Sequence, residues 1–290
     1  MANAIALFKQ YLPLLDEVYK TSSLTSVLDG ANELVTQGAN ANELIIQKMS
    51  MDGLADYSRN GGYVAGSVTL TNETVKCNFD RGRMFSIDNM DNAETAGMAY
   101  GRLSAEFIRT KVVPELDAFR FATYAGTTGI GTATGSLATG DAVIAAIAAG
   151  YDKMTDDEVP ETERYLFITP TLRGLVRDLD TTKSKEIMNR FAGVVSVPQS
   201  RFYTAIEQYD GTTGGETAGG YAKASGGVNI NFMIVHKPAV IQFDKHVAPK
   251  VVTPEQNQDA DAWKFGYRNV GIAEVYENKV AGVYLHKVGA

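Results

Sequence analysis

The stretch NAETAGMAYGRLSAEFIRTKVVPELDAFRFATY, residues 92–124, decides the fold of this chain. Its apolar residues recur at the spacing of a helix with one buried face: Leu103, Phe107, Ile108, Val112, Leu116 and Phe119. Opposite charges also stand at the spacing of same-face ion pairs, as in Arg102–Glu106, Glu106–Arg109 and Asp117–Arg120. Such a helix would be roughly 45 Å long, more than the diameter of a small domain. We therefore predict a spine helix that spans the molecule.

Pro114 stands inside this predicted helix. In a helix interior, proline removes a backbone donor and clashes with the preceding turn, at a cost of about 3 kcal/mol. The carbonyl about four residues back, near Thr110, loses its partner, which permits a kink. We predict a bend of the spine helix at Pro114. It is either a fixed kink that follows the body or a point where the helix changes shape.

Upstream of the helix, two extended stretches flank a glycine-rich tip. The second stretch, residues 67–88, alternates apolar and polar residues with the period of a half-exposed strand. The tip SRNGGYVAG, residues 58–66, contains Asn60-Gly61-Gly62, a strong turn signal. We predict a long β-hairpin within residues 34–91. Because an isolated hairpin is marginally stable in water, it needs a partner surface in its own chain or in another.

Downstream of the helix, strands and helices alternate. The stretch GTTGIGTATGSLATG, residues 126–140, predicts a loop, and residues 141–154 predict a helix with an acidic N-terminal cap. RYLFITP, residues 164–170, predicts a buried strand that a short helix follows, and residues 228–243 predict two more buried strands. This order predicts an α+β fold.

Composition narrows the function classes. The chain has 290 residues, of which 44% are hydrophobic, so it can bury a sizeable core. Its net charge of -7 argues against a surface built to coat nucleic acid. Cys77 is its one cysteine, which excludes an intrachain disulfide and favours a cytosolic folding environment. We find no signal peptide and no run of about 18 apolar residues, so we expect no membrane helix.

Candidate catalytic and metal motifs are weak. With one cysteine, the three histidines are too far apart to form a zinc motif: His236, His246 and His286. In GIGTATG, residues 129–135, the third glycine comes one residue too late for a dinucleotide fingerprint. The acidic residues 156–163 lack the spacing of a calcium loop. We expect no enzyme, no cofactor and no metal; a small-molecule enzyme that uses the Gly-Thr loop near Gly131 is a remote alternative.

Three arginines make the predicted hairpin basic along part of its length. Arg81 and Arg83 stand two residues apart, on the same side of an extended strand, and Arg59 lies near the tip. They are either ordinary solvated charges or inter-subunit contacts that form ion pairs with an acidic surface of a neighbour. The acidic balance of the remaining chain makes such a surface available.

The order of these parts resembles the major capsid proteins of tailed bacteriophages, which have the Hong Kong 97-type fold; encapsulins share that fold. The resemblance covers nearly the whole chain and looks most like the capsid proteins of siphophages. No single segment carries it; the set does: residues 79–91 (FDRGRMFSIDNMD), 100–126 (YGRLSAEFIRTKVVPELDAFRFATYAG), 164–175 (RYLFITPTLRGL) and 233–287.

The resemblance implies an N-terminal arm, an extended β-hairpin loop over an adjacent subunit, and a long spine helix, with peripheral and axial domains. The implied parts are the arm at 1–33, the extended loop at 34–91, the spine helix at 92–126, the axial domain at 127–239, the peripheral strands at 240–272 and the axial return at 273–290. In this family the spine helix bends in immature shells and straightens on maturation, which supports the hinge interpretation of Pro114.

The resemblance also implies a function. Such subunits are homo-oligomers, hexamers and pentamers, that close an icosahedral virion capsid around double-stranded DNA in the host cytoplasm. Portal, scaffolding and decoration proteins are implied as further partners, the DNA is near without specific recognition, and no membrane is involved. An encapsulin-type nanocompartment is the alternative. Some members crosslink a lysine of the extended loop to a neighbour's asparagine, and Lys48, Lys76 and Asn269 stand in the matching regions.

Overall fold

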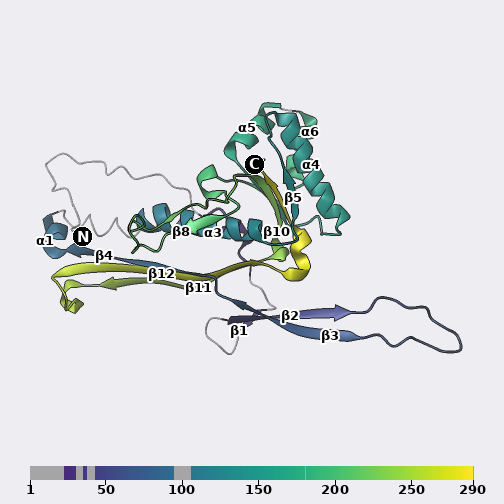
Figure 1. Ribbon diagram of the computed structural model, residues 1–290, viewed down its shortest axis with the longest axis horizontal. Helices are drawn as coiled ribbons and strands as arrows, with labels where there is room; N and C mark the ends of the chain where they lie inside the picture. Colours follow the sequence, from purple (N-terminus) through teal and green to yellow (C-terminus); the bar gives the residue numbers. More distant parts are fainter. Residues whose placement is uncertain (1–22, 31–34, 38–42, 95–105, 180, 290) are drawn as a thin grey trace.

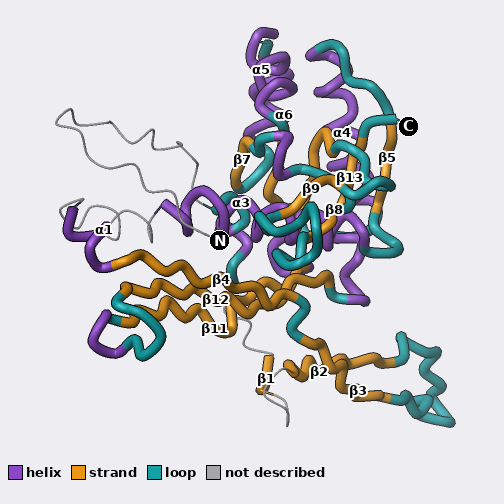
Figure 2. Tube along the Cα trace, turned by 60° about the vertical axis from the view of Figure 1, so that its left-hand side comes forward, coloured by secondary structure: helices purple, strands orange, loops and turns teal. Residues whose placement is uncertain are grey.

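The computed structural model describes residues 23–30, 35–37, 43–94, 106–179 and 181–289. Figure 1 shows three parts: a helix-covered sheet, a long flat sheet of three strands, and a hairpin that projects away from both. A helix runs between the two body sheets, as Figures 1 and 2 agree. The hairpin extends sideways from the body, whereas the rest of the described chain is packed together.

The helix between the sheets is the predicted spine. It is helical at residues 106–107, forms one π-helical turn, η2 (Ile108–Val112), and continues as α3 (Val113–Gly126). A short helix, α1 (Asn89–Glu94), precedes it, and residues 95–105 lie outside the described residues. The structure thus confirms the predicted helix over residues 106–126.

Pro114 lies in the first turn of α3, directly after the π-helical turn. The N–H of Val113 donates to the carbonyl of Ile108, five residues back, so the hydrogen-bond ladder is already widened where the proline enters. Because the regular i→i−4 pattern is already interrupted there, the missing N–H of proline costs less than it would inside a regular α-helix. The π-helical turn therefore accommodates Pro114. The sequence had instead predicted a regular α-helix around this proline.

The five-stranded sheet carries the core. Its strands stand in the order β5-β13-β10-β6-β7, and alternate residues point to opposite faces. Leu166 and Ile234 face a cluster built by the covering helices, and Phe167 and Met233 face a second cluster that contains Phe121 of α3. The strands are β5 (Gly131–Thr134), β6 (Arg164–Ile168), β7 (Gly193–Ser196), β10 (Ile230–His236) and β13 (Val283–Lys287); the covering helices are α4 (Gly140–Asp156), α5 (Pro170–Leu179) and α6 (Thr182–Asn189).

The long sheet has the order β11-β12-β4, with β11 (Val240–Val252), β12 (Ala262–Val275) and β4 (Phe79–Asp88). Its strands are antiparallel, and β12 aligns Phe265 with Phe85 of β4. Aromatic rings join this sheet to the spine: the Phe79 and Phe119 ring centroids are 5.1 Å apart. Burial of these rings fixes the sheet against the helix.

The projecting hairpin consists of β2 (Glu43–Met51) and β3 (Val68–Lys76), with the short β1 (Val35–Gln37) beside β2. Near its tip, Ser58 pairs with Gly62, whose φ of 77° suits glycine. The hairpin and its glycine turn, both predicted from the sequence, are confirmed.

The predicted extended loop at 34–91 consists of two parts in the structure. The hairpin ends at Lys76, and Phe79–Asp88 forms β4, which pairs with β12 of the body. The reason is burial: Phe79 and Ile87 are almost completely buried, so their alternate face belongs to the core. The period of two identifies a strand but not its partner.

A small ladder and several short turns complete the described chain. The ladder joins β8 (Ile206–Gln208) to β9 (Tyr221–Lys223). The predicted loop at 126–140 is strand β5 over Gly131–Thr134, where Gly131 lies against the Tyr284 ring. The short helical turns are η1 (Ser26–Leu28), η3 (Gln199–Arg201), η4 (Lys237–Ala239), η5 (Pro254–Gln256) and η6 (Glu277–Gly282).

Candidate functional site: assembly surfaces and the network behind them

The outer half of the hairpin carries an exposed apolar face. Register places Met49 opposite Leu70 and Met51 opposite Val68, so the four side chains share one side of the ladder. They are 57–66% exposed. Residues of the other side at this level are polar, among them Ser50 and Thr69. We call Met49, Met51, Val68 and Leu70 the hairpin apolar face.

The tip of the hairpin also exposes apolar side chains. The rings of Tyr57 and Tyr63 lie 4.9 Å apart, and both are exposed, as are Leu54 and Val64. Contiguous apolar side chains in water are unfavourable, and such patches mark interaction sites. The hairpin therefore has the surface of an element that packs against another molecule.

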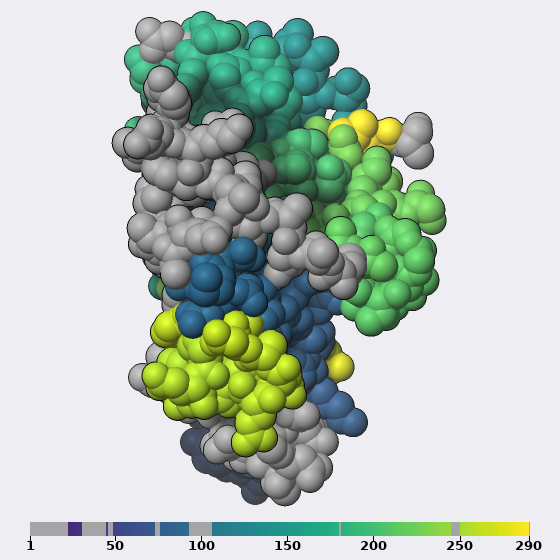
Figure 3. All heavy atoms as spheres, turned by 90° about the vertical axis from the view of Figure 1, so that its left-hand side faces the viewer, coloured from purple at the N-terminus to yellow at the C-terminus, as the bar shows by residue number. Residues whose placement is uncertain are grey.

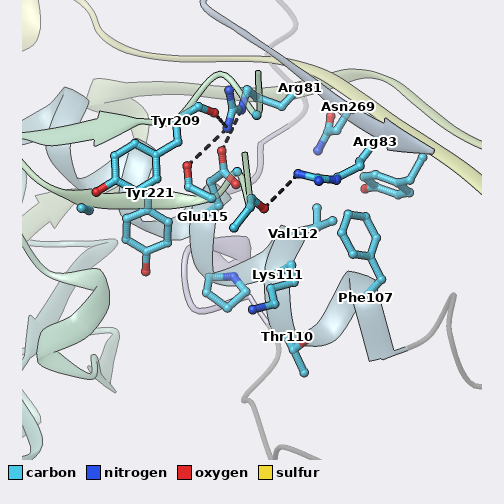
Figure 4. Close-up of a pocket in the computed structure, with 18 of the residues that line it drawn as sticks. Arg81, Arg83, Phe107, Thr110, Lys111, Val112, Glu115, Tyr209, Tyr221 and Asn269 are labelled. Atoms are coloured by element: carbon cyan, nitrogen blue, oxygen red, sulfur yellow. Dashed lines mark hydrogen bonds and ion pairs between the residues drawn. The ribbon is translucent and has the colours of Figure 1, made fainter. Parts of the chain in front are cut away.

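The two arginines predicted near each other do lie on the same side of β4, and both contact one loop. Arg81 forms an ion pair with Glu115 of α3 at 2.8 Å and donates to the carbonyl of Tyr209 at 2.8 Å. Arg83 donates to the carbonyls of Ala218 at 2.9 Å and Thr217 at 3.0 Å. Figure 4 shows both guanidinium groups pointing from the strand toward this loop.

These contacts join three parts of the chain: β4, α3 and the loop at 209–220. They border an open groove of about 1260 Å³ lined by Phe107, Lys111, Tyr221 and Asn269, among others. In Figure 3 the green residues around 200–220 form a lobe of the surface beside the long sheet. Arg81 and Arg83 thus connect the loop to the sheet, and an additional contact with a neighbour stays a prediction.

Gly219 allows the guanidinium of Arg83 to lie close to the backbone of the loop. Its φ is 66°, and a Cβ at this position would lie 2.7 Å from Nη1 of Arg83. A side chain would therefore be strained by its backbone and would displace the guanidinium. Gly214 in the same loop has open space around it.

Arg59 lies apart from the other two arginines. It is exposed at the hairpin tip, next to the Ser58–Gly62 turn. Within the part of the chain that the structure describes, no ion pair is found for it. Its predicted role at a subunit contact stays a prediction.

A buried polar network lies behind the spine helix. The carboxylate of Asp117 is fully buried and accepts hydrogen bonds from the Thr25 hydroxyl at 2.8 Å and from Nη1 of Arg201 at 2.8 Å. Arg120, 2% exposed, donates to Asp244 of β11 at 2.8 Å. Asp117 and Arg120, predicted as a same-face pair, therefore form ion pairs with different residues, Arg201 and Asp244, although both contact the Thr25 hydroxyl.

The network anchors the segment at residues 23–29. The amide N–H of Leu24 donates to Asp117 at 3.0 Å, and the Gln242 amide donates to the carbonyl of Thr25 at 2.7 Å. Tyr124 donates to Gln242, and burial raises the pKa of its hydroxyl well above the ordinary value. Sequence reasoning missed these residues because the partners are about 90 positions or more apart.

Asn269, which stands in the region where the resemblance implies a crosslinked asparagine, is buried. Its side chain is 2% exposed, and its amide oxygen has no hydrogen-bond partner in the described chain. The side chains of Lys48 and His246 lie outside the described residues. Among the residues described, no group of His, Cys, Asp and Glu could hold a metal ion, and no helix is long and apolar enough to cross a membrane.

Solved structures share this architecture over nearly the whole chain. A chain from Mycobacterium phage Che8 has a TM-score of 0.65 and 15% identity, covering 99% of this chain and 96% of that chain. The capsid of the cyanophage P-SCSP1u gives 0.63 and 11%, covering 97% and 93%. A virus-like particle from Pyrococcus furiosus gives 0.53 and 10%, covering 91% and 97%. No protein-family model and no curated protein matches the sequence.

The likeness establishes the fold. Helix and strand order, the projecting hairpin and the spine are those of the Hong Kong 97-type fold. The fold predicted from the sequence is therefore confirmed.

Proposed function

We propose that this chain is the shell-forming subunit of a tailed bacteriophage, a major capsid protein that self-assembles as hexamers and pentamers into an icosahedral shell around double-stranded DNA. The observation that carries the proposal is the hairpin apolar face, exposed in a chain whose fold matches capsid chains from end to end. A surface of this kind is stable in water when a second copy covers it.

The surface area buried between subunits would stabilise such a shell. A two-stranded hairpin is marginally stable alone, so packing against a neighbour stabilises it and removes its apolar face from water. Permanent assemblies commonly bury about 2,000 Å² or more per interface. Closed symmetry repeats the same contact around the shell, which multiplies weak contacts.

The proposal also gives each part of the chain a role in the shell. Residues 1–33 would act as the arm, 127–239 and 273–290 as the axial domain, and 240–272 with the spine as the peripheral domain. A net charge of -7 would disfavour tight binding of the subunit to packaged DNA. The site of action would be the virion capsid after assembly in the host cytoplasm, with portal, scaffolding and decoration proteins as partners.

A second candidate is an encapsulin-type shell that encloses protein. The match to the virus-like particle from Pyrococcus furiosus favours it, because that chain shares the fold over 91% of this one. The two kinds of shell differ in what they enclose. Particles purified from infected cells and treated with nuclease would retain DNA under the first function and protein cargo under the second.

Imaging of purified protein tests the proposal. Negative-stain microscopy should show closed particles or sheets of hexamers, with or without a scaffolding protein. A sharp 31.3 kDa monomer at high concentration in both conditions would contradict it.

A further inference from the structure

On its β3 side, the hairpin is joined to the body through a very short root. Its second strand, β3, ends at Lys76, and β4 begins at Phe79, which leaves Cys77 and Asn78 between them. Among the described strands, the sheet of β1, β2 and β3 shares no pairing with the long sheet. On the β3 side, the direction of the hairpin (Figure 1) therefore depends on this root.

The side chain of Asn78 continues the ladder that its backbone leaves. The last backbone pair between β4 and β12 is Phe79 with Gly271. At the next position, Nδ2 of Asn78 donates to the carbonyl of Ala273 at 2.7 Å, and the Ala273 N–H donates to Oδ1 at 3.1 Å. A side-chain amide thus replaces a peptide group on the edge of β12, so the backbone is free to turn outward.

The surroundings fix one side of the root and leave the other open. Phe79 is 3% exposed and packs on Phe119, which holds the body side. Beside Asn78 lies an open hollow of about 420 Å³, lined also by Thr123, Glu277 and Val280. Packing therefore does not block a swing of the root into this hollow, and the two hydrogen bonds of Asn78 oppose it.

We propose that Asn78 is a positioning residue that sets the angle at which the hairpin leaves the body. If the chain is a shell subunit, as proposed above, this angle also sets where the hairpin apolar face meets the neighbour, and so the curvature of the shell. The first claim concerns one subunit; the second rests on the proposed function.

The first claim is tested on unassembled subunits. Spin labels at Gly61→Cys on the exposed tip and Glu186→Cys on α6, in a Cys77→Ala background, report the distance from tip to body. Asn78→Ala should broaden the distance distribution, and hydrogen exchange at the Ala273 N–H should become roughly tenfold faster, because that group loses its partner. Asn72→Ala, an exposed asparagine of β3, is the matched control and should change neither.

Asn78→Asp separates positioning from simple loss of structure. It retains an acceptor for the Ala273 N–H but sets a second oxygen against the Ala273 carbonyl, so exchange should stay slow while the tip distribution broadens. An unchanged tip distribution in both Asn78 variants would overturn the proposal. If Asn78→Ala unfolds the subunit, the tip distance distribution and the Ala273 exchange rate of Asn78→Asp decide whether the proposal holds.

The second claim is read from particles. Asn78→Ala should give shells of mixed diameter, whereas wild type and Asn72→Ala give one size. Uniform shells from Asn78→Ala would overturn the link to curvature and leave the proposed function intact. Absence of shells from wild type would instead contradict the proposed function, while the subunit distances would still test the positioning role of Asn78.

Discussion

Asp117 and Arg201 form an ion pair at 2.8 Å, with side chains 0% and 3% exposed, between the spine helix and the turn η3. Taking two charges out of water is costly, and their attraction with further hydrogen bonds offsets the cost. Here the further bonds come from Ser23, Leu24 and Thr25. The pair therefore ties the start of the described chain to its centre.

Removal of one charge should show this directly. Asp117→Ala removes the buried carboxylate that pairs with Arg201 and that Ser23, Leu24 and Thr25 bind, so the free energy of unfolding should fall by about 3–5 kcal/mol. Urea titration followed by circular dichroism measures the loss. Glu106→Ala, which breaks a partly exposed pair with Arg109 on the same helix, should cost less than about 1 kcal/mol. Equal losses in the two variants would contradict the role given to Asp117.

Gly219→Ala should release the loop at 209–220 from the sheet. Alanine in the left-handed region costs about 1–2 kcal/mol, and its Cβ would displace the guanidinium of Arg83. Limited proteolysis should therefore cut the loop faster than in wild type. Gly214→Ala, which meets open space, is the control, and equal cleavage of the two variants would refute the explanation.

Pro114→Ala tests the position of the proline in its helix. Directly after the π-helical turn the regular hydrogen-bond ladder is already interrupted, so the free energy of unfolding should change by less than about 1 kcal/mol. A proline in a continuous helix interior would give a gain near 3 kcal/mol on replacement. A gain of that size would contradict the π-helical turn before the proline. Unchanged shell expansion in the same variant would remove the hinge interpretation.

Stability should fall as the solution becomes mildly acidic, and His286 is one cause. It stacks on Phe232 with centroids 5.0 Å apart, and burial lowers its pKa from the ordinary 6.5. Because the unfolded chain takes up the proton at higher pH than the folded one, this contribution is complete above 6.5 and is lost as pH falls below it.

A variant without the His286 imidazole should show a smaller change of the free energy of unfolding with pH. His286→Phe keeps an aromatic ring but does not titrate, so its free energy of unfolding should drop less than that of wild type between about pH 8 and about pH 5. His236, whose pKa burial also lowers, contributes a further part of the slope. Identical slopes for wild type and variant would show that His286 does not contribute.

Local patterns explain which parts of the fold were predictable. The spine shows the helical period around Leu116, and the tip shows a turn at Gly61-Gly62; both depend on neighbours in sequence. The pairing of Phe85 with Phe265 joins positions far apart, and no local period encodes it. The same holds for Thr25 and Asp117, whose contact forms only when the core closes.

The candidate site was predictable to a similar degree. Alternation identified Val68 and Leu70 as one face of a strand, but only the register with β2 shows that Met49 and Met51 complete an exposed surface. Arg59 was grouped with Arg81 and Arg83 because all three fall within the predicted hairpin. The structure separates them, because the chain leaves the hairpin at its root and enters the body sheet.

The most direct test of the account is particle formation by a chain with an altered hairpin apolar face. Sedimentation velocity compares wild type with the double variant Met51→Ser and Val68→Ser, and with Met90→Ser, an equally exposed methionine of α1, as control. We predict closed particles for wild type and control, and only subunits or small oligomers with unchanged circular dichroism for the double variant. Particles of the double variant in wild-type yield would contradict the claim that this face holds the shell together.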